Sequence, residues 1–71
     1  MKKKEFGVVK WFDLYRQFGF ICCSDGSEIF FHASEITTPH YAYFHEGQRV
    51  SYRINTNSVR NEAVNVMVLN T

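Results

Sequence analysis

Phe18-Gly19-Phe20-Ile21 and Ile29-Phe30-Phe31-His32 are the two segments that decide the fold of this sequence. Read as β-strands, they have side chains that alternate between two faces. The Asp25-Gly26 pair between them is typical of a hairpin turn, so the segments are expected to pair antiparallel. One face of the hairpin then carries Ile21, Ile29 and Phe31, and the other carries Phe18, Phe20, Phe30 and His32.

The two faces of this hairpin predict different roles. A small sheet must bury one apolar face, and the face with Ile21, Ile29 and Phe31 suits a core. Covering the other face would need many more residues than this chain of 71 has, because each aromatic ring covers about 150–250 Å². Exposed, flat and neutral rings suit stacking on unpaired bases. The alternative is a sheet covered on both faces, for example by self-association.

Length and composition favour a single small domain over residues 1–71, with residues 1–4 as a flexible basic tail. Aromatic residues make up 17% of the chain, which argues against disorder. The net charge is only +1, so there is no strong overall field to attract a polyanion. Affinity for a nucleic acid would therefore have to come from stacking and from a few local cations.

The apolar segments and the two cysteines bear on the cellular compartment and on metal or cofactor binding. No apolar run is long enough to span a bilayer, and Lys2-Lys3-Lys4 is followed by Glu5 rather than by a signal-peptide core. Cys22 and Cys23 are adjacent, which disfavours a disulfide between them. Two free thiols predict a cytoplasmic protein, and without a Cys-x-x-Cys spacing neither a metal site nor a cofactor is expected.

Further strands are expected on either side of the hairpin. The first covers about Glu5 to Asp13, where Trp11 and Phe12 can share a face only if the strand bends or bulges. Strict alternation places Val9 and Trp11 on the same face of this strand. Residues 14–17 form a polar link. Residues 33–36 are expected to form one helical turn that Ser34 caps and from which Ile36 reaches the core.

A long loop over residues 37–46 separates this turn from two more strands. The fourth strand opens at Gly47 and alternates Val50, Tyr52 and Ile54 with Ser51, Arg53 and Asn55. The fifth alternates Val64, Val66 and Val68 with Asn65, Met67 and Leu69. These elements predict an all-β fold, a five-stranded antiparallel barrel of the oligonucleotide/oligosaccharide-binding (OB) type.

Several segments together resemble the bacterial cold-shock domain family. They match in order from about Phe6 to Leu69, and they are residues 7–13, 18–21, 25–26, 29–32, 46–48 and 63–66. The resemblance implies a barrel that binds single-stranded RNA and DNA. It also implies an RNA chaperone that loosens RNA secondary structure, often during growth at low temperature.

The family's contact residues can be carried over by position. They fall on Lys10, Trp11, Phe12, Phe18, Phe20, Phe30 and His32, and Tyr41 matches a loop position that is usually aromatic. Arg16 stands beside the rings, where a cation can reach a phosphate, and Arg60 matches a family arginine to within about a residue. The departures are Asp13 for asparagine, Arg16-Gln17 for Lys-Gly, Phe31 for a smaller aliphatic residue and Ala33 for phenylalanine. We expect them to weaken binding without abolishing it.

Three classes of function were weighed. The leading prediction is a sequence-tolerant binder of single-stranded RNA and DNA. The alternative is a protein-interaction module on the same barrel, which Asp13, Ala33 and the low net charge favour. An enzyme is not expected, because no spacing of His, Cys and carboxylates assembles a nucleophile, a base and an orienting group. The chain is expected to be a monomer, with a dimer formed by strand exchange left open.

Overall fold

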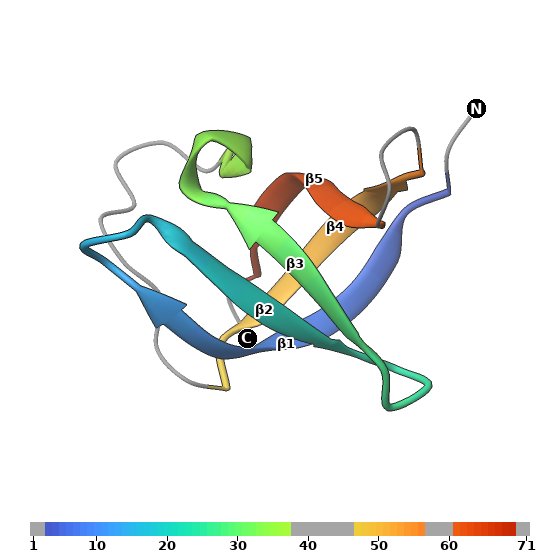
Figure 1. The fold of residues 1–71 in the computed structure, drawn as a ribbon. Helices are drawn as coiled ribbons and strands as arrows, with labels where there is room; N and C mark the ends of the chain where they lie inside the picture. The colour runs from blue at the N-terminus through green and yellow to red at the C-terminus, as the bar shows by residue number, and fades with distance from the viewer. Residues whose placement is uncertain (1–2, 38–46, 57–60, 70–71) are drawn as a thin grey trace.

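The barrel in this protein closes through five strands. The computed structural model describes residues 3–37, 47–56 and 61–69. Its elements are β1 (Glu5–Asp13), β2 (Phe18–Cys23), β3 (Glu28–His32), the 3-10 turn η1 (Ala33–Glu35), β4 (Arg49–Asn55) and β5 (Glu62–Val68). The strands are hydrogen-bonded in the order β1-β2-β3-β5-β4 and close into a barrel (Figure 1). The predicted all-β, five-stranded OB-type barrel is confirmed.

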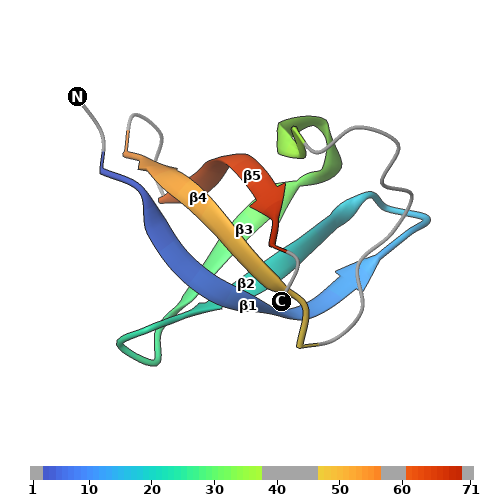
Figure 2. The same cartoon turned by 180° about the vertical axis from the view of Figure 1, so that it is seen from behind.

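The pairing is antiparallel except at one seam. There β3 runs parallel to β5, with Phe30 opposite Glu62 and Phe31 opposite Ala63. The first half of β1 pairs with β4, while most of β1 also pairs with β2, so this strand bends between the two sides of the barrel. Seen from the opposite side, the barrel presents β4, β5 and the start of β1 to the viewer (Figure 2).

The β2–β3 hairpin has the predicted register. Ile21 pairs with Ile29 and Phe20 pairs with Phe30. The turn places Gly26 at a φ of 90°, a conformation that glycine adopts without steric cost. Asp25 accepts a hydrogen bond from the Ser27 amide at 2.9 Å, as turn aspartates commonly do.

The core lies inside the barrel and contains the residues that alternation assigned to it on the hairpin. Ile21 and Phe31 are 0% exposed and Ile29 is 5% exposed, which confirms the assignment of the aliphatic face. The other buried apolar residues are Val9, Val50, Tyr52, Ala63 and Val66. Ile36 packs against this cluster from the segment after η1, as predicted.

A bulge in β1 changes the alternation of that strand. The pairing with β2 shifts between Val9 and Trp11, so Val9 pairs with Ile21 while Trp11 pairs with Phe20. Val9 is buried and Trp11 is 40% exposed. The expectation that they share a face is therefore wrong, because the extra residue, Lys10, rotates the rest of the strand. Phe12 consequently turns toward the core.

A second irregularity lies between β4 and β5. Ser51 pairs with Met67 and Arg53 pairs with Val64, so Tyr52 faces two residues, Asn65 and Val66. Two sequence predictions fail here. Ser51 is 2% exposed rather than solvent-facing, and Ala63, not Val64, is the buried residue at the start of β5. Asn65 absorbs the extra length with a φ of 53°, a left-handed conformation that asparagine tolerates.

The helical turn after β3 is present, but its cap differs from the prediction. His32, not Ser34, is the N-cap, and its side chain accepts a hydrogen bond from the Ser34 amide. Ala33 starts η1 and donates its own amide to the carbonyl of Gln17 at 2.8 Å. Gln17 lies at a φ of 61°, so the position where the family has glycine does require a left-handed backbone.

Some predictions fall outside the described residues. They are the placements of Tyr41 and Arg60, most of the loop over residues 37–46, and the start of the basic tail. The fourth strand opens at Arg49 rather than at Gly47. In the described ranges no helix has the length and apolar character needed to cross a membrane.

Candidate nucleic-acid interface

Four aromatic rings from three neighbouring strands form one group on the outside of the barrel. We call Trp11, Phe18, Phe20 and Phe30 the aromatic cluster. Trp11 lies 5.5 Å from Phe18 and 5.4 Å from Phe20, measured between ring centroids. Phe30 lies 5.5 Å from Phe18 and 5.9 Å from Phe20. These spacings and tilted or edge-on angles are typical of favourable ring contacts, so each ring is held by its neighbours.

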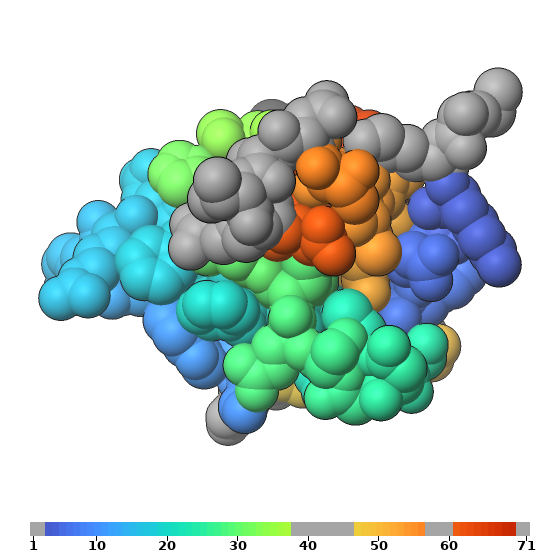
Figure 3. Space-filling view, turned by 45° about the vertical axis from the view of Figure 1, so that its right-hand side comes forward, coloured from blue at the N-terminus to red at the C-terminus, as the bar shows by residue number. Residues whose placement is uncertain are grey.

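The cluster is open to solvent on its outer side. Trp11 is 40% exposed, and the three phenylalanines are half-buried. In Figure 3 the teal and green residues of β2, β3 and their connecting turn gather at the lower front, with blue residues of β1 beside them. Gly19 separates Phe18 from Phe20 and is buried against β1, where a Cβ would collide with the carbonyl oxygen of Trp11. Glycine thus lets the ring-bearing strands approach closely.

Lys10, at the bulge beside Trp11, carries one of the predicted cations. Its ammonium group donates a hydrogen bond to Glu28 Oε2 and forms an ion pair with it. This hydrogen bond and the charge of Glu28 raise the pKa of Lys10 above its usual value. Sequence reasoning missed Glu28, because the pairing joins positions 18 residues apart and depends on the bulge. A phosphate that binds Lys10 would have to compete with this carboxylate.

Arg16, the second predicted cation, also lies near a carboxylate. Its Nε is 3.8 Å from Asp13 Oδ2, and the arginine side chain is 76% exposed. Asp13 Oδ1 accepts hydrogen bonds from the amides of Tyr15 and Arg16, at 2.9 Å and 3.1 Å. Asp13 therefore organises the β1–β2 turn, a role for which its residue type is well suited. Its charge nevertheless lies where the sequence placed a phosphate path.

His32 is exposed at the end of β3, on the same outer face as Phe18 and Phe30. Phe18 pairs with His32 across the hairpin. The Nδ1 atom of His32 accepts a hydrogen bond from the Ser34 amide at 3.0 Å and lies 3.0 Å from Ser34 Oγ. With Nδ1 acting as an acceptor, the neutral ring carries its proton on Nε2. That arrangement gives the outer face one ring N–H donor suited to a base edge.

Phe12, another predicted contact, is not part of the cluster. Phe12 packs inward, with its ring stacked on that of Phe31 at a centroid distance of 5.7 Å. A binding role for Phe12 stays a prediction, as do the roles of Tyr41 and Arg60, which lie outside the described residues. Within the described ranges, His, Cys, Asp and Glu side chains form no group suited to hold a metal ion. Cys22 and Cys23 are both free thiols.

The fold and the site together define a class of protein. A closed five-stranded barrel with an exposed aromatic cluster is an OB-type barrel. The model of the 'Cold-shock' DNA-binding domain matches residues 5–69. The chain therefore belongs to the cold-shock domain family, a family of non-enzymatic nucleic-acid-binding domains.

Bacterial relatives match over nearly the whole chain. The chain is 43% identical over 70 residues to "Cold shock-like protein CspB" of Yersinia pestis, covering 97% of this chain and 100% of that protein. It is 39% identical to the CspB of Escherichia coli (strain K12), covering 96% and 97%. It is 36% identical to a "Major cold shock protein" of Streptococcus pyogenes serotype M6, covering 89% and 94%.

A solved structure supports the fold independently. The structure titled "drosophila Unr CSD456" superposes with a TM-score of 0.82 at 23% sequence identity. The match covers 96% of this chain and 27% of that one. At this level of identity the likeness bears on the barrel alone.

Proposed function

We propose that this protein binds single-stranded RNA and DNA by stacking unpaired bases on the aromatic cluster, and that it acts as an RNA chaperone. The observation that carries the proposal is the cluster itself, four rings on three adjacent strands with an open outer side. Each base stacked on an aromatic ring contributes roughly 1–3 kcal/mol and depends little on sequence. His32 would add a polar contact, and Lys10 and Arg16 would meet phosphates.

The proposal also covers the cellular compartment, the domain organisation and the oligomeric state of the protein. We place it in the cytoplasm as a single-domain monomer over residues 1–71. Support comes from the two free thiols, Cys22 and Cys23, and from the bacterial cold-shock proteins to which the chain is similar.

Neighbouring residues on β3 provide the sharpest test of the binding surface. Phe30→Ala should weaken binding of a short pyrimidine-rich strand by roughly 1–3 kcal/mol, because it removes a stacking ring. Its cost to stability should be smaller than that of Ile29→Ala, since Phe30 is only half-buried. Ile29 is 5% exposed, so Ile29→Ala should destabilise the fold by roughly 2–5 kcal/mol while the folded fraction binds normally.

Thermal melts and binding isotherms on both variants decide the outcome. If Phe30→Ala unfolds the protein while Ile29→Ala abolishes binding without loss of stability, the faces are assigned backwards.

The chaperone role has its own readout, the opening of a fluorescently labelled RNA hairpin. The parent protein should open the hairpin, and Phe30→Ala should do so less. A parent protein that binds single strands but leaves the hairpin closed would contradict the chaperone role alone.

A protein-interaction module is the second candidate, and one specific observation favours it. Both described cations beside the cluster, Lys10 and Arg16, lie close to carboxylates of the same chain. This lowers the positive charge offered to a phosphate backbone. A gel-shift experiment with a short single strand separates the two functions. Retention of the strand supports the nucleic-acid binder, and its absence, in a folded protein, supports the interaction module.

A further inference from the structure

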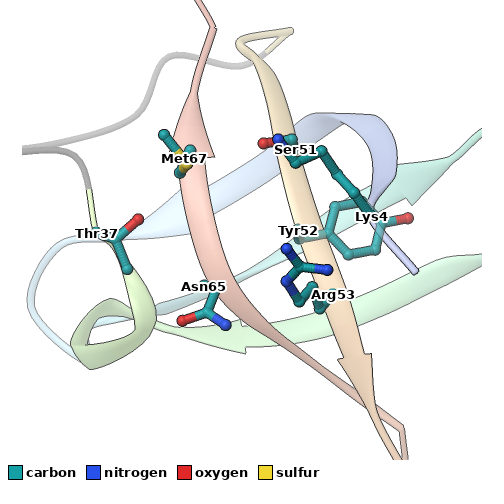
Figure 4. Close-up of a pocket in the computed structure, with 7 residues that line it drawn as sticks. All are labelled: Lys4, Thr37, Ser51, Tyr52, Arg53, Asn65 and Met67. Atoms are coloured by element: carbon teal, nitrogen blue, oxygen red, sulfur yellow. The ribbon is translucent and has the colours of Figure 1, made fainter. Parts of the chain in front are cut away.

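A hollow lined by both polar and apolar side chains lies on strands that do not carry the aromatic cluster. Its volume is about 270 Å³, and its lining comes from β4, β5 and the residues that flank β1 and η1. Two cations from separate segments, Lys4 and Arg53, contribute to it, together with the polar side chains of Thr37, Ser51 and Asn65. Figure 4 shows Lys4 extending across β4 toward Ser51, with Arg53 in front of β4 and Asn65 on β5. No described residue of the lining is acidic.

The hollow lies where the pairing of β4 with β5 is irregular. Because Tyr52 faces both Asn65 and Val66, Val66 points into the core while Asn65 is exposed on the outer surface. Asn65 adopts a left-handed backbone with a φ of 53°, a conformation that asparagine adopts more readily than most residues other than glycine. Regular alternation would have placed Val64 on the inner face with Val66, whereas Ala63 is the buried residue here. Asn65 stays on the outer surface, and it lines the hollow together with Arg53 of β4.

The hydrogen bonds around the hollow hold its walls in place. Thr37 donates its amide and its hydroxyl to the carbonyl of Val66, at 2.8 Å and 3.3 Å, so the segment after η1 is fastened to β5. Glu35 Oε1 accepts from the Asn65 amide at 3.4 Å, which is a long contact. This carboxylate is outside the lining, but its charge opposes an anion in the hollow. Ser51 is 2% exposed and lies at the floor.

From this geometry we infer that the hollow binds a phosphate group. Two cations and an amide side chain line this concave surface, and phosphate accepts several charge-assisted hydrogen bonds at once. The phosphate can come from two sources, the backbone of a single strand that continues beyond the aromatic cluster, or a free nucleotide. In the first case the inference rests on the proposed function, and in the second it does not.

Titration of the isotopically labelled full chain with inorganic phosphate, at constant ionic strength set by chloride, tests the site directly. Amide resonances of Thr37, Ser51 and Asn65 should shift and saturate. Lys4→Gln and Arg53→Gln should each weaken phosphate binding by about two- to fivefold, as expected for an exposed charge pair. Arg53→Lys keeps the charge and should retain most of the affinity, which separates loss of charge from loss of folding.

Lys3→Gln is the matched control, because it removes the same charge one residue away and Lys3 does not line the hollow. It should leave phosphate binding unchanged, while Glu35→Gln should tighten it. Shifts that do not saturate, or an equal loss of affinity in Lys3→Gln, would show diffuse attraction to the basic N-terminus and overturn the site.

Two single-stranded oligonucleotides of different length identify the source of the phosphate. One is just long enough to cover the aromatic cluster, and the other is more than twice as long. If Lys4→Gln weakens binding of the longer strand only, the phosphate belongs to the same strand. If it affects neither oligonucleotide but still weakens the binding of a nucleoside monophosphate, the ligand is a free nucleotide. Failure of the proposed function would leave the inorganic phosphate response intact, so the two failures are distinguishable.

Discussion

The ring of Phe12 stacks on the buried ring of Phe31, with centroids 5.7 Å apart and planes inclined by 20°. Trp11, the preceding residue, faces the other way and contacts Phe20 on the outer surface. The bulge at Lys10 makes this division possible, because it lets Val9 and Phe12 both point inward. Phe31, larger than the aliphatic residue expected at its position, thus packs against a second aromatic ring.

Substitution of these two neighbours should separate packing from binding. Phe12→Ala removes a half-buried ring from the core and should lower the free energy of unfolding by about 2–3 kcal/mol, somewhat less than for a fully buried phenylalanine. Trp11→Ala should instead weaken single-strand binding by roughly 1–3 kcal/mol. Urea denaturation and binding isotherms on both variants measure the two effects. Weak binding by a fully stable Phe12→Ala would instead assign its ring to the nucleic-acid surface.

Alternation predicted the faces of the β2–β3 hairpin because that hairpin pairs without interruption. Ile21 and Ile29 are cross-strand partners, and so are Phe20 and Phe30, so a period of two is preserved throughout. The same rule failed for Val64, because one extra residue in β5 shifts the alternation of that strand. It also failed for Ser51, which is buried although both of its neighbours are buried too. Sequence alone does not reveal such an insertion, because Asn65 has the polarity of an ordinary exposed strand residue.

For a related reason, the sequence predicted some residues of the candidate interface and missed others. Trp11 joins the cluster only through the bulge in β1, so alternation did not predict its face. The rings of Phe18, Phe20 and Phe30 lie on the regular β2–β3 hairpin, so their shared face followed from the sequence. The electrostatic partner of Lys10 did not, because Glu28 comes near only when the barrel curves and β1 bulges. The contact between Asp13 and Arg16 is local, because the two residues are three positions apart, and Asp13 was already expected from the sequence to weaken binding.

Replacement of Gln17 by glycine should stabilise the protein. Gln17 has a φ of 61°, a conformation that costs a residue with a Cβ roughly 1–2 kcal/mol. Glycine removes this cost but loses more entropy on folding, so we expect a net gain of about 0.5–1 kcal/mol. Denaturant titration measures the change. Gln17→Ala is the control and should show no gain, and equal stabilities for the glycine and alanine variants would refute the strain.

Glu28→Gln should strengthen single-strand binding by freeing Lys10. Removing the carboxylate ends the competition with phosphate, so affinity should rise about two- to fivefold. With two or three cations engaged in the parent protein, and Lys10 only partly so, a plot of log K against log salt should have a slope of magnitude roughly 1.5–2. Full engagement of Lys10 should increase this magnitude by up to about 0.7. Binding isotherms at several salt concentrations give both quantities. The pKa of Lys10 should also move back toward its usual value.

Glu5→Gln is the control for this change, because it removes the same charge from β1 without touching the Lys10 ion pair. An equal gain of affinity in both variants would mean that only the net charge matters. No gain in Glu28→Gln would show that Lys10 does not meet a phosphate.

The buried hydroxyl of Tyr52 should make the fold sensitive to alkaline pH. Tyr52 is 2% exposed and donates a hydrogen bond to Cys23 Sγ at 3.0 Å. Burial, with a further contribution from the Cys23 contact, raises the pKa of Tyr52 above its usual value. An unfolded tyrosine loses its proton near pH 10, whereas the folded one keeps it to higher pH, so the stabilising difference is fully present below about pH 10.

Above that pH the free energy of unfolding should fall as pH rises, by up to about 1.4 kcal/mol per pH unit for this one group. Tyr52→Phe cannot ionise, so its stability should decline less steeply over the same range, although the variant starts lower because it lacks the hydrogen bond to Cys23. Urea denaturation at a series of pH values measures both slopes. Tyr15→Phe, at a position 95% exposed, should keep the steep slope of the parent. If Tyr52→Phe and the parent lose stability in parallel above about pH 10, the alkaline sensitivity comes from other groups.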